Sequence, residues 1–428
     1  MSKVGIMVQV GRASEETANS KTLSTNLIML KHYIFFTRNV MPQPGAAHLV
    51  HAANSADGMA NLGYPSLLIH LSKEPSALNL TNLLRPFQPQ APSEELINLY
   101  NLRGKLKVAA LPTPKLKSTS KLLKKATHPS TLIAKYYFPI HIRPAAQIVH
   151  SRDWNFVESA IKCGVPAIYE HHHHEEKQFD PEIVQNPLLQ VAVTVADSVR
   201  ESMIQNGLPA DKIVKLHSGF NSVFLNRQPE QAATWRKQLL TNEQYLVVYA
   251  GALLPFKGVD LLLDVTQQLT HAHFAFAGGD ETQVTAYKQL AIEKQLRNVT
   301  FLGHLSHTSL PGLLQAADVL AHPHCSGPAS TFTSPLKLFD YLASGTPIVA
   351  TEITSLVEFK SCNAIAGWCE PDNPDSFARC IQQVLETYPR KSEGYSHMID
   401  YVQQFSWENR AAKLLSYVKD SMRPVLLQ

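Results

Sequence analysis

The apolar residues of this chain gather in short unbroken runs, and most runs are followed by a stretch with the period of an amphipathic helix. Short apolar runs bounded by turn residues are typical of strands that are buried on both faces of a sheet. In the first half of the chain we expect such strands at four places: 32–37, 66–70, 147–150 and 167–170. A helix is expected over 46–62, ended by Gly63. This alternation predicts parallel sheets with helices on both faces.

The second half of the chain repeats the pattern. Its strand and helix segments are expected at 246–263, 274–280, 299–305 and 310–324. A chain of 428 residues is too long for one compact core and suggests two domains. We expect two Rossmann-like, doubly wound α/β domains over 31–225 and 226–405, after an N-terminal extension of uncertain structure over 1–30. The polar stretch 225–242 is interpreted as the linker between the domains.

The segment 334–350, SPLKLFDYLASGTPIVA, predicts a helix followed by a buried strand. Ser334 is a good N-cap and Pro335 is tolerated in the first turn. A helix start offers unpaired backbone N–H groups that suit a phosphate. Lys337 adds a positive charge there, which disfavours the helix unless an anion is bound. Asp340, one turn further, can accept hydrogen bonds from sugar hydroxyls. An ordinary buried helix–strand unit explains the pattern about equally well.

This segment resembles the nucleotide-sugar signature of glycosyltransferase family 4, in the subgroup with the motif Ser-Pro-x-Lys-x-x-Glu-Tyr. Asp340 replaces the usual Glu, and Phe332 stands where many members carry an acidic residue, a departure that this subgroup shares. The resemblance covers residues 31–425 approximately and implies the GT-B architecture, in which two Rossmann-like domains face a cleft. It also implies that 406–428 forms a helix that packs back on the first domain.

A second element, Gly251 to Gly258, resembles the family pattern Gly-x(5)-Lys-Gly. The resemblance implies that Lys257 holds the donor diphosphate, whereas a lone lysine would be read as a surface residue. Ala252 stands where many members carry an arginine, and Lys337 is expected to supply the missing charge.

A double glycine, Gly278 and Gly279, ends the strand expected at 274–280. It lies at the carboxyl edge of the predicted sheet, where ligands bind in open α/β sheets. Gly279 is therefore a candidate donor contact. A tight turn that needs positive φ is an equally good interpretation of both glycines.

In the first domain, the segment His150-Ser151-Arg152-Asp153 resembles the family's His-x-His/Arg-Asp segment at the end of a strand. A histidine of that pattern often contacts the donor sugar, and the corresponding residue here is Arg152. His150, Arg152 and Asp153 are all candidates for the catalytic contact. For His150 a purely structural role at the strand end is the alternative.

The run His171–His174, followed by Glu175 and Glu176, invites a metal interpretation. Consecutive histidines rarely face one ion, because zinc ligands are usually spaced by two to five residues. The family resemblance also implies chemistry without a metal, so we predict none. Glu170 and His171 resemble the family's Tyr-Glu-x-His strand end, which lines the cleft.

The net charge of +4 is spread unevenly, because no Asp or Glu occurs between Leu96 and Arg152. This window holds the basic residues Arg103, Lys105, Lys107, Lys115, Lys117, Lys121, Lys124, Lys125, Lys135, Arg143 and Arg152. It is interpreted as a solvated basic face, a surface for an anionic membrane, or an attractor of a phosphorylated acceptor. No nucleic-acid motif accompanies the charge, so nucleic acid is not expected.

Two further features bear on the compartment. The five cysteines lack paired spacing and are interpreted as reduced thiols. No apolar run approaches the roughly 20 residues needed to cross a bilayer, and no signal pattern begins the chain. The sequence therefore predicts a cytoplasmic protein, with peripheral contact at the inner face of the membrane as a further expectation.

Taken with the resemblance, these features predict a retaining glycosyltransferase of polysaccharide or related biosynthesis. Its donor would be a UDP- or GDP-sugar, without a further cofactor, and its acceptor a glycan, a lipid-linked sugar or a small molecule. Lys257, Lys337 and the helix start at Ser334–Leu336 would stabilise the leaving diphosphate. The alternatives are a non-catalytic GT-B-like binding or scaffold protein of polysaccharide assembly, and an epimerase or phosphorylase on the same fold.

Overall fold

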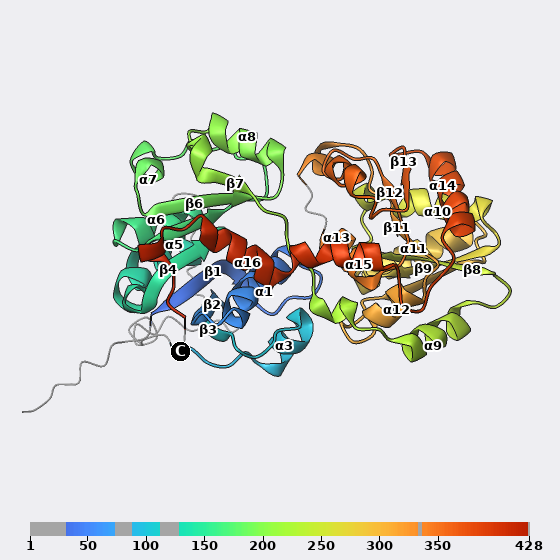
Figure 1. The fold of residues 1–428 in the computed structure, drawn as a ribbon, viewed down its shortest axis with the longest axis horizontal. Helices are drawn as coiled ribbons and strands as arrows, with labels where there is room; N and C mark the ends of the chain where they lie inside the picture. The colour runs from blue at the N-terminus through green and yellow to red at the C-terminus, as the bar shows by residue number, and fades with distance from the viewer. Residues whose placement is uncertain (1–30, 73–87, 112–127, 333–335, 427–428) are drawn as a thin grey trace, which may run out of the picture.

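The computed structural model describes residues 31–72, 88–111, 128–332 and 336–426. This part of the chain forms two α/β units that lie side by side (Figure 1). The N-terminal extension 1–30, the stretch 112–127 of the basic window, and the candidates Ser334 and Pro335 lie outside the described residues.

The first unit is built on a seven-stranded sheet in the order β3-β2-β1-β4-β5-β6-β7, and every neighbouring pair is parallel. Its strands are β1 (His32–Val40), β2 (Ser66–Leu71), β3 (Lys107–Leu111), β4 (Ala146–Ser151), β5 (Ala167–Glu170), β6 (Leu189–Thr194) and β7 (Ile213–Lys215). The strand order reverses between β1 and β4, and in open parallel sheets ligands bind beyond the carboxyl ends at such a point.

Helices cover both faces of this sheet (Figure 1). They are α1 (Ala47–Asn61), α3 (Glu94–Tyr100), α5 (Pro129–Leu132), a π-helix (Ile133–Ile142), α6 (Trp154–Lys162), α7 (Pro181–Gln185) and α8 (Asp197–Gln205). Helix α3 and strand β3 were not among the predicted elements. Ser93 caps α3 by accepting the Leu96 N–H, which is a local signal that the sequence contained.

The second unit has a six-stranded parallel sheet in the order β10-β9-β8-β11-β12-β13. Its strands are β8 (Tyr245–Ala250), β9 (Ala272–Ala277), β10 (Val299–Gly303), β11 (Val319–His322), β12 (Ile348–Thr351) and β13 (Gly367–Cys369). The helices that follow in this half of the chain are α9 (Pro229–Leu239), α10 (Val259–Gln268), α11 (Glu281–Glu293), α12 (Leu310–Ala316), α13 (Leu336–Ser344), α14 (Pro374–Thr387), α15 (Ser396–Val402) and α16 (Trp407–Ser416).

The predicted fold class, two doubly wound α/β units, is confirmed. Each sheet is buried between two apolar clusters, one on each face. Strands such as β2, in which every residue is buried, are mostly apolar in the sequence for this reason.

The interpretation of 225–242 as a linker is wrong over most of its length, because this stretch contains helix α9. Helix α9 packs against α12 and buries Ala232 and Leu239. Trp235 packs beside them, and most other residues of the helix are polar because only one of its faces meets the second unit. That narrow apolar face was overlooked in the sequence.

The last helix, α16, returns to the first unit and lies against α1 (Figure 1). Trp407 fills the contact so closely that a Cβ atom on Gly219 would lie 2.5 Å from its ring, and one on Gly58 would lie 2.8 Å from its carbonyl oxygen. Real Cβ contacts are not this short, so both positions require glycine. The helix covers only part of the 406–428 expected, because it ends at Ser416 and is followed by a 3₁₀ turn (Asp420–Met422). Among the described residues, no helix is long and apolar enough to cross a membrane.

Candidate functional site

Lys257 lies in a 3₁₀ turn (Pro255–Lys257) after β8 and is followed by Gly258 in the left-handed conformation, with φ 76°. A Cβ atom on Gly258 would lie 1.8 Å from the carbonyl oxygen of Pro323, so only glycine fits there. The turn places the ammonium group of Lys257 2.8 Å from Nε2 of His324. Burial, with contributions from the His322 and Lys257 charges, holds the pKa of His324 well below its ordinary value, so its neutral ring accepts the lysine proton.

Two lysines from different elements, Lys257 and Lys337, are near enough here for their charges to act on each other. Burial, followed by the positive charge of Lys337, lowers the pKa of Lys257 to about 8. No carboxylate of the described residues lies within ion-pair distance of Lys257 or Lys337. Two neighbouring cations that share no acidic partner form a site for an anion.

Helix α13 is fixed to the end of β8 by Tyr341. The Tyr341 hydroxyl accepts the Ala250 N–H at 2.6 Å and donates to the Ala250 carbonyl at 3.2 Å. The described part of α13 begins at Leu336, with Lys337 in its first turn. Asp340 accepts the backbone N–H of Asn221 at 3.5 Å, and burial raises its pKa to about 6 against the effect of Lys337.

Glycines bring the turns after β8, β9 and β10 into backbone contact. The Gly278 N–H donates to the Gly303 carbonyl at 2.6 Å, and a Cβ atom on Gly278 would lie 2.0 Å from the Gly251 carbonyl oxygen. Gly278 and Gly279 have φ 120° and 80°, which L side chains rarely adopt. The turn interpretation of these glycines therefore accounts for their presence.

The three catalytic candidates of the first unit lie in different surroundings. Asp153 caps α6, because its Oδ1 accepts the N–H groups of Asn155 at 3.0 Å and Phe156 at 3.4 Å. His150 is fully buried at the end of β4. Arg152 is partly exposed and makes no hydrogen bond or ion pair with any described residue.

His150 belongs to a buried cluster around Glu170 that the sequence did not reveal. The carboxylate oxygens of Glu170 lie 2.8 Å from His51 Nε2, 2.7 Å from His150 Nε2 and 2.8 Å from His172 Nε2. Arg410 of α16 donates to Glu170 at 2.5 Å. These residues come from α1, β4, β5, the loop after β5 and the last helix, so no local pattern links them.

Charge in this cluster is carried by one ion pair. Burial alone would raise the pKa of Glu170, but Arg410 and then the histidines hold it well below its ordinary value. Burial lowers the pKa of His51 to about 4 and lowers those of His150 and His172 as well. His150 is thus neutral, with Nε2–H donating to Glu170 and Nδ1 lying 2.5 Å from the Tyr33 hydroxyl.

The spacing of His51, Glu170 and His172 would permit a bound metal ion. The Arg410 guanidinium already occupies the carboxylate oxygen that such an ion would need. The consecutive histidines have different surroundings: His172 belongs to this cluster, whereas His173 and His174 lie against the Phe332 ring. The arrangement of the described residues fits an internal ion pair better than a metal centre.

We expect the protein to lose stability as the pH falls from about 6.5 to 4. Histidines of the unfolded chain take up protons near pH 6.5, whereas His51 in the folded state does so only near its lowered pKa of about 4. The unfolded state binds more protons in this range, so the free energy of unfolding decreases, by roughly 3 kcal/mol at pH 4 for His51 alone. Urea denaturation at pH 7, 6 and 5 measures this slope. His51→Gln should reduce this slope of the unfolding free energy with pH, whereas His397→Gln, which changes an exposed histidine, should not. Equal slopes in both variants would refute the lowered pKa given to His51.

The two units touch where the first-unit loop after β5 meets the segment before α13. His174 Nε2 lies 3.3 Å from the Thr331 hydroxyl, and the Ser198 hydroxyl donates to the Thr331 carbonyl at 2.8 Å. The carboxyl edges of the two sheets therefore lie next to each other across this contact. The loop 171–174 of the first unit is thus in contact with the 3₁₀ turn that ends at Thr331, six residues before Lys337.

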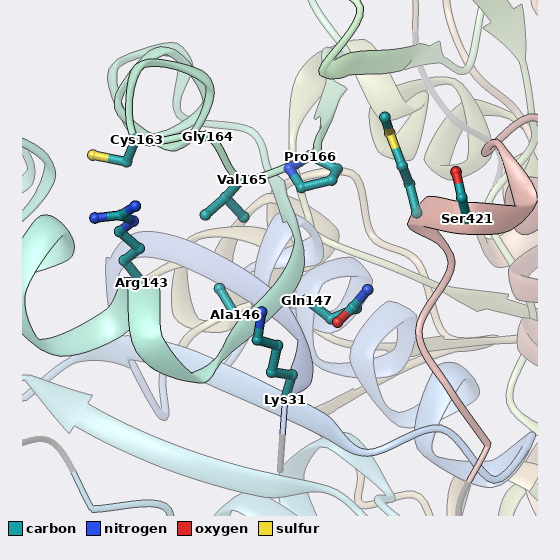
Figure 2. Close-up of a pocket in the computed structure, with 10 residues that line it drawn as sticks. Lys31, Arg143, Ala146, Gln147, Cys163, Gly164, Val165, Pro166 and Ser421 are labelled. Carbon is teal, nitrogen blue, oxygen red and sulfur yellow. The ribbon is translucent and has the colours of Figure 1, made fainter. Parts of the chain in front are cut away.

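A separate hollow of about 220 Å³ lies at the other edge of the first sheet (Figure 2). It lies at the amino ends of β1 and β4, and Lys31, Arg143 and Gln147 are among the residues that line it. Because ligands of open parallel sheets bind at the carboxyl ends, we do not assign this hollow to the site.

Comparison with known proteins gives a consistent picture. Residues 244–387 match the model of the family described as glycosyl transferases group 1. An uncharacterised glycosyltransferase of Methanocaldococcus jannaschii is 24% identical over 54% of this chain and 60% of its own length. A D-inositol 3-phosphate glycosyltransferase of Corynebacterium aurimucosum is 26% identical over 54% of this chain and 57% of its own length. The chain thus spans less than two thirds of these curated relatives.

Among solved structures, the crystal structure of HepE from Anabaena in complex with UDP and glucose is similar over 90% of this chain and 99% of its own. The TM-score is 0.64 at 16% sequence identity. A likeness at this identity shows the fold, which is GT-B, as the sequence predicted.

Proposed function

We propose that this protein is a retaining glycosyltransferase of family 4 that moves a sugar from a nucleoside diphosphate sugar to an acceptor hydroxyl. The observation that carries the proposal is the pair Lys257 and Lys337, which converge without a carboxylate partner at the carboxyl edge of a GT-B sheet. The family match over 244–387 covers both lysines. UDP is favoured as the carrier because HepE was solved with UDP and glucose.

The chemical difficulty of the reaction is the negative charge that collects on the diphosphate as the bond to the sugar breaks. Lys257 and Lys337 lie where that charge would develop, and the start of α13 adds its positive end. Because both lysines are already held in the fold at the proposed site, little reorganisation is needed when charge develops. This arrangement requires no metal.

The remaining roles follow from position. Asp340 lies one turn beyond Lys337 and is proposed to hold the ribose hydroxyls. The acceptor, a glycan, a lipid-linked sugar or a small molecule, would approach from the first unit, where Arg152 is partly exposed near the contact between the units. Peripheral contact with an anionic membrane stays a prediction. A binding protein without activity stays the alternative, because Ala252 and Arg152 depart from the family pattern.

The proposal is tested with Lys337→Ala. A calorimetric screen of UDP- and GDP-sugars first identifies the donor, and release of the nucleoside diphosphate then measures turnover. Removing one preorganised charge should cost about 3–4 kcal/mol, or roughly a hundred- to a thousandfold in turnover.

Lys288→Ala is the matched control, because Lys288 is an exposed lysine of α11 in the same unit. A loss below tenfold for Lys337→Ala would refute the role given to Lys337. Binding of a donor without any turnover would favour the binding protein, and inversion of the product's anomeric configuration would exclude a retaining reaction.

A further inference from the structure

A second group of basic side chains, two arginines and two histidines, lies at the carboxyl edge of the first sheet, apart from the two lysines. We call Arg38, His48, Arg152 and His173 the first-unit cationic cluster. Strands β1 and β4 are parallel neighbours with Phe36 opposite Ser151, so Arg38 and Arg152 both lie just beyond that pair.

The other two members reach the same edge from neighbouring elements. His48 is in the first turn of α1, and His173 is in the loop after β5, the strand next to β4. Burial and the charges of Arg152, His173 and Arg38 together lower the pKa of His48. The effect on His48 agrees with the strand register, which places Arg38 and Arg152 at the same edge of the sheet.

The acidic groups around this cluster are already engaged. Glu170 is bound by Arg410 and three histidines, and Asp153 caps α6. Glu175 lies 3.6 Å from His171 and accepts the N–H groups of Glu176 and Lys177 at 3.0 Å. Neither Arg38 nor Arg152 forms an ion pair with a described residue. The charge of Glu170 still acts on Arg152, but neither arginine of the cluster has an ion-pair partner among the described residues.

The cluster faces the second unit at the point where donor chemistry is proposed. The His173 ring lies 5.5 Å from the Phe332 ring, five residues before Lys337 in the chain. Two arginines presented together suit a phosphate, because each guanidinium can donate two parallel hydrogen bonds. A partly buried guanidinium without an acidic partner also gains free energy when such an anion binds.

From this geometry we infer that the first-unit cationic cluster binds the phosphate group of a phosphorylated acceptor, such as a sugar phosphate or polyol phosphate. The inference rests on the proposed function and adds the chemical class of the acceptor to it. It places two anion sites on the two sides of the contact, with Lys257 and Lys337 for the donor diphosphate and the cluster for the acceptor phosphate.

The test uses the full chain with saturating UDP, so that the donor site is filled. Binding of glucose 6-phosphate and of inositol phosphate is measured by calorimetry beside the parent glucose and inositol. The wild type should bind at least one phosphate ester at least tenfold more tightly than its parent. Arg38→Gln and Arg152→Gln should each weaken that binding roughly ten- to a hundredfold, the range for one charged hydrogen bond.

Two controls separate the sources of phosphate. Arg379→Gln removes an exposed arginine of α14 and should leave binding of the ester unchanged. Calorimetry with UDP alone should give dissociation constants within threefold of the wild type for Arg38→Gln and Arg152→Gln. If these variants lose UDP affinity as strongly as a Lys257 variant does, the cluster serves the donor diphosphate and the inference is wrong.

Failure of the inference is distinguishable from failure of the proposed function. If UDP binds and a donor is turned over, but esters and parents bind equally, the acceptor class is wrong and the transferase stands. If no nucleoside diphosphate binds, the proposed function is wrong. In that case the titration with phosphate esters is repeated without UDP and tests directly whether the cluster binds phosphate. Equal ester affinity of the wild type and Arg152→Gln would then show that the inference is wrong.

Discussion

Replacing Lys257 with methionine should lower donor turnover by about two to three orders of magnitude, the cost of removing one preorganised charge from a transition state. Methionine keeps much of the lysine's length and packing but cannot stabilise the departing diphosphate. The same change should weaken the binding of UDP, because Lys257 and Lys337 are the two cations of the proposed anion site.

Lys257→Met should also raise the free energy of unfolding, although it lowers turnover and UDP binding. Burial and Lys337 lower the pKa of Lys257 to about 8, from about 10.5 in the unfolded chain. At pH 7 this difference costs the folded state at most about 3 kcal/mol. The unfolded state binds more protons between pH 8 and 10.5, so the wild type gains stability as the pH rises through that window. The difference in stability between the methionine variant and the wild type should therefore decrease as the pH rises through this window.

Turnover, UDP calorimetry and urea denaturation at pH 7 and pH 10 measure these effects. Lys288→Met is the control, because it removes an exposed lysine of the same unit and should change none of the three quantities. A variant that is less active and also less stable at pH 7 would show that Lys257 supports the fold rather than the ligand.

Replacing Arg410 with methionine should destabilise the protein by about 3–5 kcal/mol, the usual cost of breaking a buried ion pair on one side. Arg410 donates to Glu170 at 2.5 Å and to the His217 carbonyl at 2.9 Å, so it joins α16 to the core of the first unit. Without it, the Glu170 carboxylate stays buried with three neutral histidines and no cation.

The pH dependence identifies the cause of this loss. With Arg410 gone, a histidine next to Glu170 should bind a proton, so its folded pKa rises above the unfolded value of about 6.5. Stability from such a histidine is present below pH 6.5 and is lost as the pH rises through the folded pKa. Arg410→Met should therefore be less harmful at pH 5.5 than at pH 8.

Urea denaturation of wild type and variant at both pH values measures the difference. The control is Lys162→Met, which breaks the exposed i,i+4 pair with Glu158 and should cost less than about 1 kcal/mol at either pH. If Arg410→Met cost no more than this control, the Glu170 cluster would not hold α16 in place.

The sequence by itself was enough to determine the fold class, for a physical reason. Strands of a parallel sheet are buried on both faces, so β2 (SLLIHL) and β5 (AIYE) are mostly apolar segments that can be recognised without their neighbours. The turn around Gly258 and the helix of Lys337 are equally local, because each places its lysine within a few residues of a strand end or a helix start.

Only the tertiary structure could decide the features that depend on distant partners. Helix α9 is mostly polar in sequence, and the few apolar residues on one side of it are explained only by their packing against α12. His51, Glu170 and Arg410 are separated by more than a hundred residues in each case, and their ion pair exists because α1, β5 and α16 meet in space. Asp153 and Arg152 are adjacent in sequence, yet one caps a helix and the other is left without a partner. A side chain's charge and its solvation are set by its neighbours in three dimensions, which local patterns do not encode.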